Sequence, residues 1–152
     1  MSEASPRFSR ERLIRFGDCD PAAIVFFPQY LVMFVALIED FIGEELGIPY
    51  ASLIGPRRTG LPTVSLACEF SHPSHMGERV SLGLRVLRLG GSSISLALDC
   101  SDIDGARARV RIRQTIVTTS LDTHRPIRIP ADLRAAIEAF DPGLRAGATE
   151  SA

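Results

Sequence analysis

The chain has 152 residues, of which 45% are hydrophobic and 23% charged, with a formal net charge of -1. These proportions are ordinary for a globular protein, and the length suits one domain with a sizeable core. The near-zero net charge offers no electrostatic argument for binding nucleic acid or an anionic membrane, and we expect neither as a partner.

Targeting signals and paired cysteines are also missing from the sequence. The N-terminal segment has no apolar stretch typical of a secretory signal, and the longest apolar run, residues 30–38, is too short to span a bilayer. The three cysteines, Cys19, Cys68 and Cys100, are far apart and form no CxxC pair. This pattern favours reduced thiols, and we expect a cytoplasmic protein.

The first eight residues are largely polar, and we expect them to be flexible. A single domain is expected over residues 9–140, followed by a flexible tail over 141–152. A first strand is predicted over Phe8–Phe16.

The segment Arg15–Tyr30 reads RFGDCDPAAIVFFPQY. Pro21 holds the preceding Asp20 in an extended conformation, and Pro28 suits the first turn of a helix. A carboxylate therefore lies just upstream of a helix N-terminus, whose backbone N–H groups lack intrahelical acceptors. Asp20 as nucleophile or base and these N–H groups as an oxyanion hole would support acyl chemistry. Alternatively, Asp20 only caps a turn.

A long helix is predicted from Pro28 to about Leu46, because apolar residues recur at steps of three and four. Its N-terminal half is apolar nearly all round, which predicts a buried helix. Gly47 and Pro49 end it. Residues 50–61 are expected to form a connection with Arg57 and Arg58 at its tip. These arginines either meet an anionic ligand or are two solvated charges, and we favour the second.

From residue 61 the apolar period becomes two, which predicts strands. The strands cover residues 61–70, 80–86, 94–98 and 108–120, with hairpin turns at Gly90–Gly91 and Asp104–Gly105. A short helix is predicted over Ala131–Phe140. One strand, one long apolar helix and a four-strand antiparallel run predict an α+β fold with a curved sheet around the helix.

The last strand carries four alternating arginines, at positions 107, 109, 111 and 113. They form either an anion track or a solvated face paired with acids such as Glu69 and Asp99, and we favour the second. His72 and His75 form an HxxH pair without a third ligand nearby, so no metal is expected.

The run FGDCDPAAIVFFPQY resembles the signature of the 4-hydroxybenzoyl-CoA thioesterase family of hotdog-fold proteins. The resemblance implies a hotdog fold, a homodimer or homotetramer with sites at the subunit interface, and hydrolysis of an acyl-CoA thioester. It aligns Asp20 with the catalytic carboxylate and the backbone N–H of Phe27 with the oxyanion donor. Asp18 is expected to be structural. No cofactor is expected, since coenzyme A is part of the substrate.

The same resemblance assigns substrate contacts. Arg88 and Ser92, at the Gly90–Gly91 hairpin, are expected to bind coenzyme A, while Val35, Ile24 and Thr63 line the acyl pocket. Relatives that act on a 4-hydroxylated ring carry a carboxylate at about the position of Val35. An apolar site leaves that ring hydroxyl unpaired, so we expect an apolar acyl group, aromatic or medium-chain.

Three alternatives stay open. A non-catalytic acyl-CoA-binding hotdog protein would have the same sequence features. A hotdog dehydratase would need a histidine on a helix or strand, and all three histidines, His72, His75 and His124, fall in expected turns. Cys19 lies inside the signature and offers a thiol nucleophile.

Overall fold

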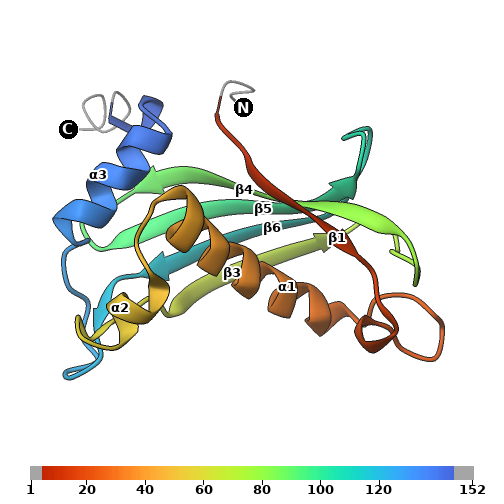
Figure 1. The fold of residues 1–152 in the computed structure, drawn as a ribbon, viewed down its shortest axis with the longest axis horizontal. Helices are drawn as coiled ribbons and strands as arrows, with labels where there is room; N and C mark the ends of the chain where they lie inside the picture. The colour runs from red at the N-terminus through yellow and green to blue at the C-terminus, as the bar shows by residue number, and fades with distance from the viewer. Residues whose placement is uncertain (1–4, 146–152) are drawn as a thin grey trace.

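A five-stranded antiparallel sheet is the frame of the computed structural model, which describes residues 5–145 (Figure 1). Its strand order is β1-β4-β5-β6-β3. The strands are β1 (Phe8–Leu13), β3 (Thr63–Phe70), β4 (Arg79–Leu89), β5 (Ser93–Asp102) and β6 (Ala108–Val117). This layout confirms the predicted α+β fold, including both hairpin turns.

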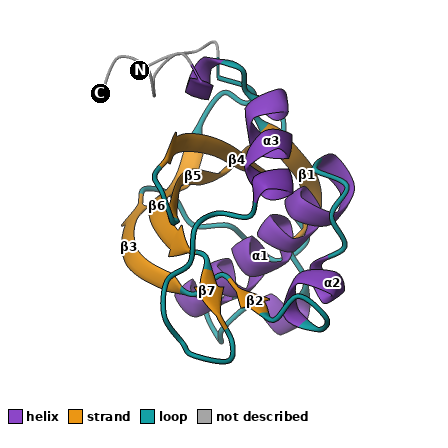
Figure 2. Ribbon diagram, turned by 90° about the vertical axis from the view of Figure 1, so that its left-hand side faces the viewer, coloured by secondary structure: helices purple, strands orange, loops and turns teal. Residues whose placement is uncertain are grey.

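Helix α1 (Phe27–Asp40) lies along one face of the sheet and continues into a π-helical turn, η2 (Phe41–Glu45) (Figures 1 and 2). Its inward side chains, such as Phe34 and Leu37, share one core with the inward side chains of β4, β5 and β6. The helix ends before Gly47, whose φ of 72° lies in the left-handed region that glycine adopts readily. The predicted helix over residues 28–46 is thus confirmed.

The prediction that α1 is buried all round is wrong for the single chain. Val32 and Val35 are 62% and 63% exposed. The sheet covers α1 from one side only (Figure 2), and among residues 5–145 nothing covers Val32 and Val35 on the opposite side of the helix.

Strand β3 is exposed along its whole length. Its ladder partner is β6, and it is the last strand of the five-stranded sheet. Three large apolar side chains of β3 are therefore open to solvent, as are three of α1, including Phe27 at its first position. We call five of these residues the open apolar face: Val32, Val35, Val64, Leu66 and Phe70.

The connection over residues 50–61 contains secondary structure that the sequence did not predict. It contains a short helix, α2 (Tyr50–Ile54), and a short strand, β2 (Thr59–Gly60), which pairs with β7 (Thr119–Ser120). Arg57 and Arg58 are exposed, but each has an acid partner. Helix α3 (Ala131–Phe140) is confirmed over the predicted residues and buries Leu133 and Ile137.

The ends of the folded part differ slightly from the prediction. Phe8 already belongs to β1, and Arg7 is bonded to Asp99 and Ser81. At the other end Asp141 is buried and Leu144 packs against the core. The remaining residues of the two predicted flexible segments, 1–4 and 146–152, lie outside the described residues.

Candidate active site

Asp20 opens a tight turn between two short antiparallel arms. Cys19 pairs with Val25 as an isolated bridge, and the Asp20 N–H donates to the Ile24 carbonyl at 3.0 Å. Ala23 adopts a φ of 63°, which non-glycine residues rarely take. Such a conformation persists only where the surroundings determine it strongly, which makes this turn a well-defined feature.

The Asp20 carboxylate is partly exposed, and its Oδ1 accepts the Ala22 N–H at 2.8 Å. Asp20 therefore does cap its own turn, as the simpler reading expected. Within residues 5–145, no hydrogen bond joins its second oxygen, Oδ2, to the protein. One oxygen thus orients the carboxylate, while the other can face a substrate.

Phe27 is the first residue of α1, one position earlier than predicted, and Pro28 follows it inside the helix. An N–H at this position has no intrahelical acceptor, and no other acceptor pairs with it in the described part of the chain. The α1 N-terminus also carries positive dipole charge. The Phe27 N–H is therefore available as a donor to a developing oxyanion.

Asp18 ties the turn to the helix. Its buried carboxylate accepts Arg12 Nη2 at 3.0 Å and the Arg15 N–H at 2.9 Å. Its carbonyl oxygen accepts the Phe26 N–H at 3.0 Å. These contacts support the structural role expected for Asp18, because they close residues 18–26 into a loop that brings the Asp20 turn back to the start of α1.

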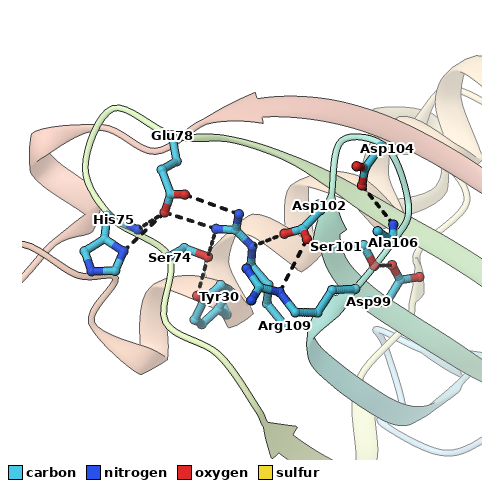
Figure 3. Close-up of polar contacts among 11 residues, drawn as sticks. Tyr30, Ser74, His75, Glu78, Asp99, Ser101, Asp102, Asp104, Ala106 and Arg109 are labelled. Carbon is cyan, nitrogen blue, oxygen red and sulfur yellow. Dashed lines mark hydrogen bonds and ion pairs between the residues drawn. The ribbon is translucent and has the colours of Figure 1, made fainter.

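Sequence reasoning missed a buried polar network beside this loop (Figure 3). Arg109, read as one of four solvated arginines, is buried and bonded to Asp102, Glu78 and Ser74. Tyr30 donates to Ser74 at 3.0 Å. The four-arginine pattern carries no sign that position 109 differs, since its partners come from distant segments.

The pKa shifts in this network follow from its hydrogen bonds. The backbone N–H of His75 and the Arg109 guanidinium hold the pKa of Glu78 below its usual value. The hydrogen bond from Arg109 also lowers the pKa of Asp102. Burial raises the pKa of Tyr30, which keeps its hydroxyl protonated as the donor to Ser74. The two carboxylates bonded to Arg109, those of Glu78 and Asp102, are thus kept charged.

All three cysteines are free thiols. Burial, together with the charges of Asp18 and Asp20, raises the pKa of Cys19. A nucleophilic thiol needs a lowered pKa. The environment of Cys19 therefore argues against the thiol nucleophile and leaves Asp20 as the candidate.

The three residues expected in the acyl pocket lie on three separate segments of the described chain. Ile24 faces Asp20 across the turn and is partly buried, Val35 is exposed on α1, and Thr63 is exposed on β3, where it accepts a hydrogen bond from Gln114. A shallow hollow of about 110 Å³ between β1 and α1 contains none of them.

The hairpin between β4 and β5 carries the residues expected to bind coenzyme A. The Ser92 carbonyl accepts the Thr118 N–H at 2.8 Å, and the Gly91 carbonyl accepts the Ile129 N–H at 2.9 Å. Arg88 and Arg128, which precedes Ile129, are both exposed, and neither has an acid partner within the described range. Two uncompensated cations therefore flank this firmly held turn.

The remaining candidates have other environments. His75 is exposed and lies 3.3 Å from Glu78, while His72 and His124 are exposed in turns. Between residues 5 and 145 no three potential ligands are grouped to hold a metal ion, and no helix there is long and apolar enough to cross a membrane.

Comparison with known proteins places this geometry in a family. A family model described as the thioesterase-like superfamily matches residues 14–137. The chain is 24% identical over 130 residues to 1,4-dihydroxy-2-naphthoyl-CoA hydrolase from Synechocystis, covering 86% of this chain and 94% of that protein.

Solved structures share the fold. The crystal structure of a 1,4-dihydroxy-2-naphthoyl-CoA thioesterase from Synechocystis has a TM-score of 0.79 at 23% identity, covering 87% of this chain and 96% of that one. A gentisyl-coenzyme A thioesterase has a TM-score of 0.75 at 26% identity, covering 84% and 99%. With the family model matched from the end of β1 into α3, the chain belongs to the thioesterase-like superfamily, and its fold is the hotdog fold.

Proposed function

We propose that the protein hydrolyses the thioester bond of an aromatic acyl-CoA to a free acid and coenzyme A, with Asp20 as its catalytic carboxylate. One observation carries the proposal: a partly exposed carboxylate with a free oxygen lies in the same closed loop that leads to the unpaired Phe27 N–H. The hydrolase and thioesterase relatives support the reaction class.

Two routes use the same groups. In one, Asp20 attacks the thioester carbonyl, the C–S bond breaks, coenzyme A leaves as thiolate, and water hydrolyses the resulting anhydride to restore the carboxylate. In the other, Asp20 takes a proton from the water that attacks the carbonyl. In both, the Phe27 N–H donates to the oxyanion, and one such donor typically lowers the barrier by about 3 kcal/mol.

The acyl group follows from ring chemistry. The two relatives are named for substrates with one shared pattern, a carboxyl group beside one ring hydroxyl and a second hydroxyl opposite the first. A hydroxyl beside the carboxyl can donate to the thioester oxygen within the substrate, so an apolar pocket tolerates it. A hydroxyl opposite the thioester would need a hydrogen-bond partner where relatives acting on a 4-hydroxylated ring carry a carboxylate, and Val35 at that position offers none. Burying the hydroxyl unpaired costs about 1–3 kcal/mol. We therefore expect benzoyl-type and 2-hydroxylated rings to be preferred over 4-hydroxybenzoyl.

A second copy of the chain completes the site in this proposal. One end of the open apolar face lies next to the oxyanion donor. The centroid of the Phe70 ring is 6.2 Å from that of the Phe27 ring and 6.0 Å from that of the Tyr30 ring. A hydrophobic edge strand such as β3 is a ready site for pairing with another chain. Pairing along β3 in a homodimer would cover Val35 and enclose the acyl group. A homotetramer would then pair two such dimers.

Coenzyme A is expected to place its phosphates near the hairpin after β4, where Arg88 and Arg128 lack acid partners and Ser92 is held by Thr118. Guanidinium groups suit phosphate because they offer a fork of donors.

A substrate panel tests the function. Thiol release would be measured with benzoyl-, 2,5-dihydroxybenzoyl-, 4-hydroxybenzoyl-, phenylacetyl-, hexanoyl- and palmitoyl-CoA, alongside calorimetric binding of each ester. Turnover of the benzoyl-type esters supports the proposal. Binding without turnover would establish the non-catalytic acyl-CoA-binding protein instead. Faster turnover of 4-hydroxybenzoyl-CoA than of benzoyl-CoA would refute the argument from Val35.

A further inference from the structure

We propose that Arg109 is the positioning residue of this site: one buried guanidinium, whose contacts Figure 3 shows, sets the Asp20 turn and the first turn of α1 relative to each other. The inference rests on the proposed function for its catalytic consequence. Its structural part stands on the contacts alone.

Arg109 holds the loop 71–78 from two directions. Its side chain, only 7% exposed, donates to Ser74 Oγ at 3.2 Å and to the two oxygens of Glu78 at 3.2 and 3.3 Å. Its backbone carbonyl accepts the N–H groups of Ser71 and His72. Asp102 accepts Arg109 Nε at 2.7 Å and so fixes the plane of the guanidinium. These bonds therefore fix the position of loop 71–78 relative to Arg109.

This loop in turn holds the Asp20 turn. The Val25 N–H donates to the Ser74 carbonyl at 3.0 Å, and the Met76 N–H donates to the Ala23 carbonyl at 3.1 Å. Ile24 and His75 form a bridge between these two bonds. The left-handed residue of the turn, Ala23, is thus fixed from the side that Arg109 supports.

A second branch reaches the helix. Ser74 Oγ, which accepts from Arg109, also accepts the Tyr30 hydroxyl at 3.0 Å. Tyr30 lies in the first turn of α1, three residues after Phe27. The carboxylate and the oxyanion donor are therefore both placed relative to one cation. A displacement of about 1 Å between reacting groups can cost about a hundredfold in rate.

A purely structural role would require only that Arg109 neutralise Asp102 and Glu78 at this end of the sheet. Lysine supplies the same charge but has no planar fork, so it cannot hold Ser74, Glu78 and Asp102 together. Arg109→Lys therefore keeps the charge that neutralises Asp102 and Glu78 but removes the contacts that position the loop, so it distinguishes the two roles.

The kinetic test compares Arg109→Lys with two controls. We expect kcat to fall at least about tenfold while KM stays within about twofold, because the ester is still bound but the two groups are misplaced. Arg111→Lys, on the same strand but exposed, should leave both constants unchanged. Ile137→Val, on the buried side of α3, controls for a general loss of stability and should also leave them unchanged. Should Arg109→Lys not fold, Tyr30→Phe and Glu78→Gln each cut one branch and should lower kcat at constant KM.

Hydrogen exchange gives a readout that needs no turnover. In Arg109→Lys, or in Glu78→Gln if the lysine variant does not fold, the N–H groups of Val25 and Met76 should exchange at least about tenfold faster, with those of α3 unchanged. If the wild type hydrolysed no acyl-CoA, the proposed function would fail while this exchange pattern would still decide the positioning role. Unchanged exchange at Val25 and Met76, or a kcat equal to that of Arg111→Lys, would overturn the inference.

Discussion

Cys100 provides a quantitative test of the structure around the Arg109 network. Its thiol is fully buried, and burial raises its pKa from 9.0 to about 11, an effect that Ser74 and Arg109 partly offset. Below about pH 9 the thiol is neutral in both the folded and the unfolded chain. As the pH rises further, only the unfolded chain ionises, so stability is lost between the two pKa values.

The magnitude follows from the separation of the pKa values. One pKa unit corresponds to about 1.4 kcal/mol, so the full effect is about 3 kcal/mol, of which about 2 kcal/mol is lost by pH 11. Urea unfolding at intervals from about pH 8 to 11 would measure it in the wild type, Cys100→Ala and Cys68→Ala, whose thiol is exposed. The alanine at position 100 should lower stability at neutral pH but remove this part of the alkaline loss.

The Cys68→Ala control separates the effect of Cys100 from other losses of stability in alkali. Tyr50 also has a raised pKa, which destabilises the fold in alkali equally in every variant. The pKa of Tyr30 is raised mainly by burial, which no variant changes, and to a smaller extent by the charge of Cys100, which Cys100→Ala removes. Cys68→Ala should follow the wild type. An alkaline loss in Cys100→Ala as large as that of the wild type would refute the reasoning.

Three further outcomes are expected from the structure. Gly83→Ala places a Cβ against Arg7 Nε, which displaces Arg7 from Asp99 and should lower the free energy of unfolding by about 1 kcal/mol, whereas Gly43→Ala meets no atom within 4 Å and should not. Because the folded state lowers the pKa of Glu78, its stabilisation is lost as the pH falls below its ordinary value of 4.5, and Glu78→Gln should reduce the loss seen by thermal unfolding in acid. Leu66→Lys should convert the proposed homodimer to a monomer in light scattering, and an unchanged mass would contradict pairing along β3.

Local sequence patterns were sufficient for most of the fold. Apolar residues recur at clear intervals in strands β4, β5 and β6 and in helix α3. The end of the long helix is visible in the sequence as well, because glycine at position 47 readily adopts the left-handed conformation found there. Helix α2 and strand β2 were missed because two to five residues hold no periodic signal. The exposure of Val35 was missed for another reason: an apolar helix does not reveal how many of its sides one chain can cover.

Likewise, only part of the candidate site could be predicted from the sequence. The Asp20 turn and the start of α1 lie within one short segment, so proline positions and spacing indicated both. The role of Arg109 depends on Tyr30, Ser74 and Glu78, which belong to two other segments. A contact among three distant segments leaves no trace in the spacing of any one of them.

The most direct test of the proposed reaction is the kcat of Asp20→Asn for benzoyl-CoA, measured by thiol release at saturating substrate. Asparagine keeps the size and the turn-capping oxygen but cannot act as nucleophile or base. Asp122→Asn, which alters an exposed carboxylate paired with Arg58, is the matched control. We expect Asp20→Asn to lose about a hundredfold or more in kcat with Asp122→Asn unchanged. A kcat of Asp20→Asn close to that of the wild type would show that another group carries the reaction.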